Sequence, residues 1–194
     1  MGTEKPRSTI PPPPTPAKPP EWKKDWVWVR LSELTPTSLV LGLLRRENRP
    51  VLPSEMVAMT RQYHPDINQG TIYNLGLRLR DKRIENGGNG WTLIDPATAP
   101  VIHDEYAWGP PSVFQSFDLA AFRREAVLHV LRAVSPDGLM AMQIVRHLQQ
   151  FKSPRVPVDK TMMKVDLDIL QGKEKVKQIG NSRKWALSKS SMGP

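Results

Sequence analysis

The chain has 194 residues, enough for two domains of modest size or one larger domain, and 39% of them are hydrophobic, which is adequate for compact cores. It contains no cysteine, so disulfide bonds and thiolate metal sites are excluded. No apolar run approaches the roughly 18 residues of a membrane span, and the first ten residues lack the apolar segment of a signal peptide. We therefore expect an intracellular protein without a membrane partner, either cytoplasmic or nucleoid-associated, or nuclear if the organism is a eukaryote.

The charge is unevenly distributed along the chain. The formal net charge is +9, and residues 118–194 hold 14 Lys and Arg against seven Asp and Glu. A basic segment favours a polyanionic partner, usually nucleic acid. The alternative interpretation is a charge that only keeps the protein soluble.

The N-terminal region is divided into two segments. Residues 1–20 are rich in proline and predict a disordered tail, because proline cannot continue a helix or donate to a sheet. This tail either docks in an aromatic groove of a protein partner or is a solvated leader. Residues 21–30 form a Trp-rich segment in which Trp and Val alternate with the period of a strand. We expect its tryptophans to pack on the first domain; the alternative is a contact surface for a protein partner.

Residues 31–95 predict a first domain of three helices and a β-hairpin. Thr35 and Pro36 are a typical helix start, and Gly76 at a buried helical position indicates close backbone packing. The expected helices span residues 36–48, 53–63 and 69–83, and the expected strands span residues 84–85 and 91–94. The glycines between these strands suit a turn.

Residues 96–117 are predicted to be a Pro-rich linker whose aromatic residues pack against one or both domains. A second domain is expected over residues 118–192, with Gly172 as the stop of its third helix. Its expected helices span residues 119–134, 139–151 and 160–170, and its expected strands span residues 175–179 and 183–187.

The two domains share a pattern. In each, the third helix is followed by a strand, a Gly/Asn turn and a strand with Trp, and Ile72-x3-Gly76-x2-Leu79 matches Met163-x3-Leu167-x2-Leu170. On these residues both segments resemble winged-helix domains of the winged helix-turn-helix superfamily. The expected fold is therefore mainly α with small β-hairpins (α+β), as two winged-helix domains in tandem behind a disordered tail.

The resemblance implies double-stranded DNA as the partner, with the third helix in the major groove and the wing on the flanking backbone. In the first domain the implied DNA-binding residues are Thr71, Tyr73, Asn74 and Arg78 on the helix, followed by Arg80, Lys82 and Arg83. Asn and Arg read base edges bidentately, whereas Thr and Tyr usually contact phosphate. The alternative is an ordinary solvated helix surface.

The second domain carries a different set of charges. Its third helix offers Lys160 and Lys164, but Asp166 and Asp168 follow. These carboxylates would repel phosphates unless they accept hydrogen bonds from cytosine amino groups. Its wing carries five cations, Lys173, Lys175, Lys177, Arg183 and Lys184. The first three alternate along the expected strand, so we expect them to share a face and hold backbone phosphates without sequence preference. The alternative is a lysine-protected strand edge.

The sequence favours binding over catalysis. The four histidines are scattered without metal-ligand spacing, and the glycine-rich turn over residues 87–90 precedes a strand rather than a helix. We expect a non-enzymatic, sequence-preferring DNA-binding protein without a cofactor, a transcriptional regulator that could form a homodimer. The alternative is a protein-interaction subunit of a chromosome-organising or transcription complex, which the Pro- and Trp-rich N-terminal region favours.

Overall fold

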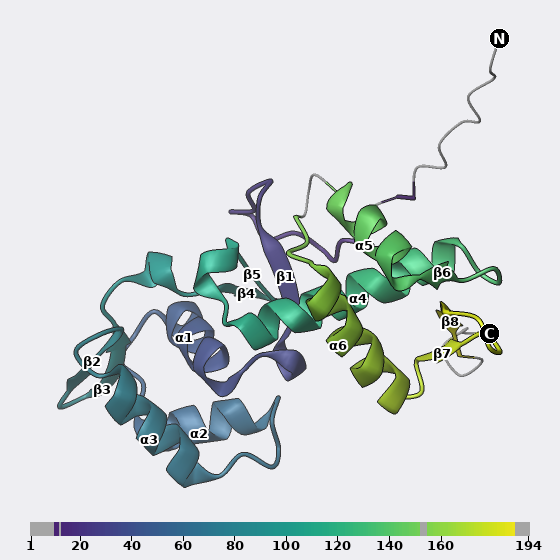
Figure 1. Ribbon diagram of the computed structural model, residues 1–194. Coiled ribbons are helices and arrows are strands. Elements are labelled where there is room, and N and C mark those ends of the chain that lie inside the picture. Colours follow the sequence, from purple (N-terminus) through teal and green to yellow (C-terminus); the bar gives the residue numbers. More distant parts are fainter. Residues whose placement is uncertain (1–9, 12, 152–154, 189–194) are drawn as a thin grey trace. The chain divides into compact units, whose positions relative to one another are not determined.

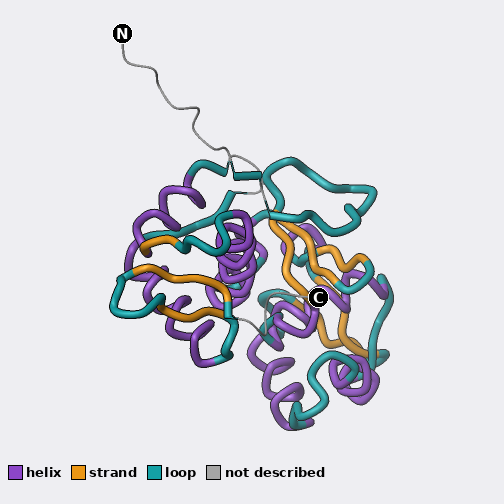
Figure 2. The backbone as a smooth tube through the Cα atoms, turned by 90° about the vertical axis from the view of Figure 1, so that its right-hand side faces the viewer, coloured by secondary structure: helices purple, strands orange, loops and turns teal. Residues whose placement is uncertain are grey.

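The computed structural model describes residues 10–11, 13–151 and 155–188 (Figure 1). Helix makes up 46% and strand 17% of this structure, and the strands are short (Figure 2), which confirms the α+β class. The chain divides into two compact units, one of Thr15–Phe122 and one that joins Arg123–Pro194 to Met1–Pro14. The boundary falls inside a helix, a few residues after the expected start of the second domain at residue 118.

The unit Thr15–Phe122 contains two small sheets and three complete helices. Its elements in chain order are β1 (Val27–Arg30), α1 (Pro36–Glu47), α2 (Pro53–Arg61), α3 (Gln69–Leu79), β2 (Ile84–Gly87), β3 (Gly90–Leu93), β4 (Val101–His103), β5 (Tyr106–Gly109) and the start of α4 (Ser116–Ala133). Three short 3-10 turns, Leu31–Glu33, Pro96–Thr98 and Pro111–Val113, connect them.

The Trp-rich segment forms a central part of this unit. Strand β1 pairs antiparallel with β5, which pairs with β4, so that Trp28 lies opposite Trp108. The Trp28 ring meets Tyr106 and Phe122 edge-on, with centroids 5.5 and 5.6 Å apart. The packing expected for these tryptophans is therefore confirmed, since Trp26 and Trp28 are buried.

Residues 96–117 differ from the expected linker. They contain β4 and β5, which complete the sheet with β1, and β4 packs against α1. The proline-rich composition concealed this, because short strands between prolines show little alternation. In the expected disordered tail, residues 1–9 and Pro12 lie outside the described residues. Ile10, Pro13 and Pro19 are buried, whereas most of the other described residues of this tail are exposed.

Local sequence explains where α1 and α3 begin and end. The Thr35 side chain accepts the Ser38 N–H at the start of α1, Pro36 is its first residue, and Asn48 ends it with φ of 49°. Helix α3 ends at Leu79 rather than at the expected residue 83. Asp81 takes φ of 61° and donates its N–H to the Ile84 carbonyl at 3.0 Å, which turns the chain out of the helix.

The β2–β3 hairpin closes against the helices that precede it (Figure 1). A Cβ on Gly76 would lie 2.2 Å from Cζ2 of Trp91, so only glycine lets α3 approach the hairpin, as expected. Gly90 has φ of 123°, and a Cβ there would lie 2.6 Å from the Val51 carbonyl. Val51 forms an isolated antiparallel bridge with Trp91.

The other unit holds most of α4 and the remaining elements. These are β6 (Leu139–Met140), α5 (Ala141–Gln149), α6 (Lys160–Gly172), β7 (Val176–Gln178) and β8 (Lys184–Leu187), with the sheet order β6-β8-β7. Strand β6 occupies the first two residues of the expected helix over residues 139–151, so this helix begins two residues later than expected. Gly172 is the last helical residue, and Glu174 with φ of 55° makes the reversal assigned to Gly172.

The two units repeat one order of elements. Each has a helix, a short extended segment, two further helices and a hairpin whose last strand returns to the extended segment. The returning contact is Val51 to Trp91 in one unit and Leu139 to Trp185 in the other. The repeat seen in the sequence therefore extends to the pairing around each tryptophan.

Candidate nucleic-acid interface

Helix α3 presents a polar face. The Asn68 side chain accepts the Gly70 N–H at 2.7 Å and starts the helix, while Ile72, Leu75 and Gly76 are buried. The opposite positions are therefore exposed, and they hold Thr71, Tyr73, Asn74 and Arg78. Thr71, Asn74 and Arg78 are spaced i, i+3 and i+7, so they form one stripe on the helix.

The three cations after α3 are not equivalent. Lys82 and Arg80 are exposed, and the Arg80 Nε lies 3.5 Å from Asp81 Oδ2. Arg83 is half-buried and donates to the Thr98 carbonyl, and its Nε is buried without a hydrogen-bond partner among the described residues. Arg83 thus ties the end of α3 to the turn that follows β3, which limits the phosphate contact expected of it.

The β2–β3 hairpin adds almost no charge to this unit's surface. Its exposed residues from position 85 to 89 are polar or glycine, and Glu85 is the charged residue among them. Any contact this hairpin makes with DNA therefore depends on backbone and amide groups rather than on cations.

Helix α6 differs from the expectation at one acidic residue. Lys160 and Lys164 are exposed, but Asp166 is fully buried and contacts Arg123 and Arg124 of α4, the latter at 3.4 Å. Arg123 also donates to the Pro157 carbonyl at 3.1 Å. Asp166 therefore does not face solvent to repel phosphates, as the sequence suggested; it neutralises two arginines inside the unit. Asp168 remains exposed.

An apolar stripe on α6 was missed by the sequence reasoning. Met162, Val165 and Ile169 are 41%, 52% and 38% exposed and are spaced i, i+3 and i+7. The match of Met163-x3-Leu167-x2-Leu170 to the motif in α3 assigns them to the positions of Thr71, Asn74 and Arg78. The sequence alignment of the two motifs therefore already contains this difference between the outward residues of α3 and α6.

The second hairpin carries the expected cations in a different geometry. Lys173, Lys175, Lys177, Arg183 and Lys184 are all exposed. Lys173 caps α6 and Lys175 precedes β7, so the three lysines do not alternate along one strand as expected. Lys175 and Lys177 still alternate about the buried Val176, because the Ser188 N–H donates to the Lys175 carbonyl and extends the ladder at 3.0 Å.

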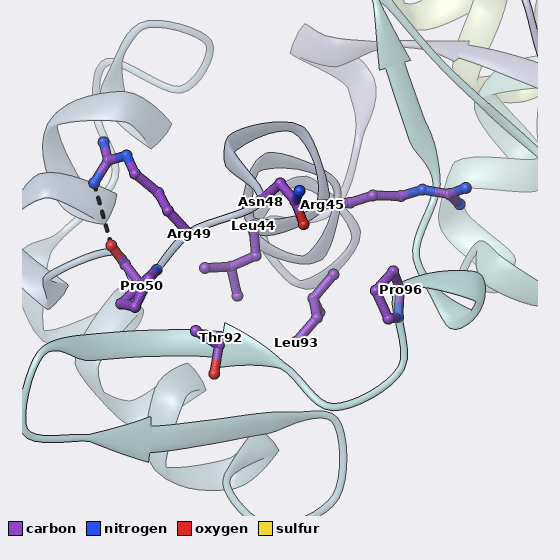
Figure 3. Close-up of a pocket in the computed structure, with 8 residues that line it drawn as sticks. All are labelled: Leu44, Arg45, Asn48, Arg49, Pro50, Thr92, Leu93 and Pro96. Carbon is purple, nitrogen blue, oxygen red and sulfur yellow. Dashed lines mark hydrogen bonds between the residues drawn. The ribbon is translucent and has the colours of Figure 1, made fainter.

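The hollows on the Thr15–Phe122 unit include one between the end of α1 and β3 (Figure 3). Its volume is about 170 Å³, and its two arginines are already engaged. Arg45 donates to the Ala99 carbonyl at 2.6 Å, while Arg49 donates to the Pro50 carbonyl at 3.2 Å and pairs with Glu55. The hydrogen bond to Arg49 lowers the pKa of the Glu55 carboxyl. This hollow therefore offers no free cation to a ligand.

The histidines add no catalytic arrangement. Among the described residues, no group of three or more His, Asp or Glu side chains is placed to hold a metal ion. His147 is half-buried, and burial lowers the pKa of its imidazole. His129 Nε2 lies 2.9 Å from the Pro11 carbonyl. No helix in the described part of the chain is long and apolar enough to span a membrane.

Comparisons with known proteins identify no family for this chain, so its surfaces are interpreted from their chemistry. No protein-family model matches the chain, and no curated protein matches it either. One solved structure, the DIP2311 protein from Corynebacterium diphtheriae, is similar over 78% of this chain at 14% identity, with a TM-score of 0.28. This chain spans 26% of that chain's length.

Proposed function

We propose that both units are winged-helix domains and that the protein is a non-enzymatic, sequence-preferring DNA-binding protein, a transcriptional regulator. The observation that carries this proposal is the exposed stripe of Thr71, Asn74 and Arg78 on α3. The Trp-rich segment and residues 96–117 pair with each other in a separate sheet of the unit. The stripe is thus left open, as entry into a major groove requires.

In this proposal the two units have different tasks. Asn74 and Arg78 supply the amide and guanidinium groups that pair with adenine and guanine edges. The five exposed cations around the second hairpin supply contacts to phosphates, which add affinity that falls with salt. Lys160 and Lys164 at the start of α6 add to the same charge.

A second candidate function is supported by the stripe of Met162, Val165 and Ile169. Apolar side chains in the positions of a reading helix cannot hydrogen-bond to base edges, and exposed apolar residues in a row favour a protein surface. In this alternative the unit that contains α6 docks on a protein of a chromosome-organising or transcription complex. A hybrid of the two functions places DNA on α3 and protein on α6.

Fluorescence anisotropy with labelled duplexes tests the proposal directly. A random duplex pool is bound at low salt, bound sequences are selected over several rounds, and the affinity of the selected site is measured as salt increases. We expect an enriched site and an affinity that falls steeply with salt. An absence of duplex binding at low salt would contradict the proposal. Cross-linking of a protein from the source cell through α6, without DNA, would favour the alternative.

A further inference from the structure

A basic hollow lies beside the C-terminal end of α3, within the Thr15–Phe122 unit. Its volume is about 470 Å³, which is in the range of small-molecule sites. Four of its lining residues are cationic: Arg78, Arg80, Lys82 and Arg83. No carboxylate is among the residues that line it. Four of the 12 Lys and Arg residues in the unit line this one hollow, although the unit as a whole holds 12 Asp and Glu residues and is electrically balanced.

Two polar residues from other elements complete the hollow. Thr37 is the second residue of α1, and Gln115 directly precedes α4. Both positions lie at helix N-termini, where backbone N–H groups carry partial positive charge. The rest of the lining is apolar and consists of Leu75, Leu77 and Leu79. The polar part of the lining combines cations, a hydroxyl and an amide, which are the donors that bind phosphate oxygens.

The acidic groups near the hollow are largely engaged elsewhere. Asp118 is fully buried and accepts hydrogen bonds from the Thr35 and Gln115 N–H groups, at 2.6 and 2.8 Å, and from the Ser38 hydroxyl at 2.5 Å. The Asp81 carboxylate lies 3.5 Å from the Arg80 Nε, and its side chain is 83% exposed. No ion pair binds Arg78 or Lys82 within the described structure.

We propose that this hollow binds a phosphate group, held by Arg78 and Lys82 with Thr37 and Gln115 as the neutral donors. Arg83 has a structural role at its wall, because it already donates to the Thr98 carbonyl. The phosphate belongs either to the DNA backbone beside α3 or to a free phosphate compound. Arg78 is shared with the stripe proposed above to read DNA, but binding of a free phosphate compound in the hollow does not require DNA.

Isothermal titration of the full chain with inorganic pyrophosphate at low salt tests the site. We expect saturable binding that is weakened about tenfold or more when Arg78→Gln and Lys82→Gln are combined, because charge-assisted hydrogen bonds are lost. Thr37→Val should weaken binding less. Lys23→Gln, an exposed lysine that does not line this hollow, is the matched control and should bind like the parent. Thermal unfolding of each variant confirms that it is folded.

The single variant Lys82→Gln separates the two sources of phosphate, because Lys82 lies outside the stripe proposed to read bases. If pyrophosphate competes with duplex DNA and Lys82→Gln weakens the binding of both, the hollow holds a backbone phosphate. If Lys82→Gln weakens the binding of pyrophosphate alone, the ligand is a free phosphate compound. The proposal is overturned if the parent shows no saturable pyrophosphate binding, or if Lys23→Gln loses as much as the double variant. DNA binding that persists in that case leaves the proposed function intact.

Discussion

The third helices of the two units match on their inner faces and differ on their outer faces. Both bury residues at corresponding positions, Ile72 and Gly76 in α3 and Met163 and Leu167 in α6. The outward stripe is Thr71, Asn74 and Arg78 in α3 but Met162, Val165 and Ile169 in α6. Burial fixes the pattern that makes the fold, whereas the exposed residues are free to serve a different partner in each copy.

The two hairpins differ in the charge that they carry. The β2–β3 hairpin carries Glu85 and no cation, whereas five exposed cations surround the β7–β8 hairpin. The helix with the polar stripe is thus followed by a hairpin without cations, and the helix with the apolar stripe by a basic hairpin. Four predictions follow from this contrast between the units, in order of the size of the expected effect.

The largest effect on stability is expected at a charged residue on the buried face of α6. Asp166 in α6 occupies the position of Leu75 in α3 and is buried against Arg123 and Arg124. Asp166→Ala leaves a buried arginine unpaired, so we expect a loss of about 3–5 kcal/mol in the free energy of unfolding. Urea denaturation measures it. Asp168→Ala, at an exposed position two residues later, should change stability by less than about 0.5 kcal/mol.

A smaller effect is expected at Gly76, which corresponds to Leu167. In Gly76→Ala the new Cβ overlaps the Trp91 ring, so overpacking should destabilise the unit by about 3 kcal/mol against a gain in helix propensity of about 1 kcal/mol. The expected net loss is about 2 kcal/mol, measured by thermal or urea unfolding. Gly172→Ala has no atom within 4 Å of its new Cβ and should be neutral or stabilising. A stable Gly76→Ala would show that α3 does not approach the hairpin closely.

The outer stripes can be compared on DNA. Asn74→Ala should reduce discrimination at one base pair of the selected site by about 1–3 kcal/mol, because a bidentate contact is lost. Val165→Ala removes a side chain from the corresponding position of α6 and should leave the site preference unchanged. Competition anisotropy with single-base variants of the site measures both. Equal losses in the two variants would mean that both helices read DNA, and no loss in either would remove α3 from the interface.

The smallest effect on affinity at physiological salt is expected from the second hairpin. Lys175→Ala combined with Lys177→Ala should weaken binding to all sequences and reduce the salt slope by about 2, because each lysine releases about one counterion. The control is Asn86→Ala combined with Asn89→Ala in the β2–β3 hairpin, which has no cation, and it should preserve the slope. Anisotropy over a range of salt concentrations measures the slopes. An unchanged slope in the lysine variant would place the phosphate contacts elsewhere.

The sequence alone determined the elements whose signals are local. The Thr35 and Pro36 start of α1, the strand period of the Trp-rich segment and the close packing at Gly76 were all predicted and are confirmed. Each depends on a cap, a fixed φ or a periodicity that operates within a few residues. The exposed positions on α3 follow from the same helical period.

The tertiary structure decided what depends on contacts between residues far apart in the chain. Strands β4 and β5 form in the expected linker because β5 pairs with β1, some 80 residues earlier, and β4 pairs with β5. Asp166 is an internal counter-ion rather than a surface charge because α4 brings two arginines to it. The basic hollow likewise joins the end of α3 to Thr37 and Gln115. Periodicity tells which side of a helix is buried, but only packing brings the partner that gives a charged residue its role.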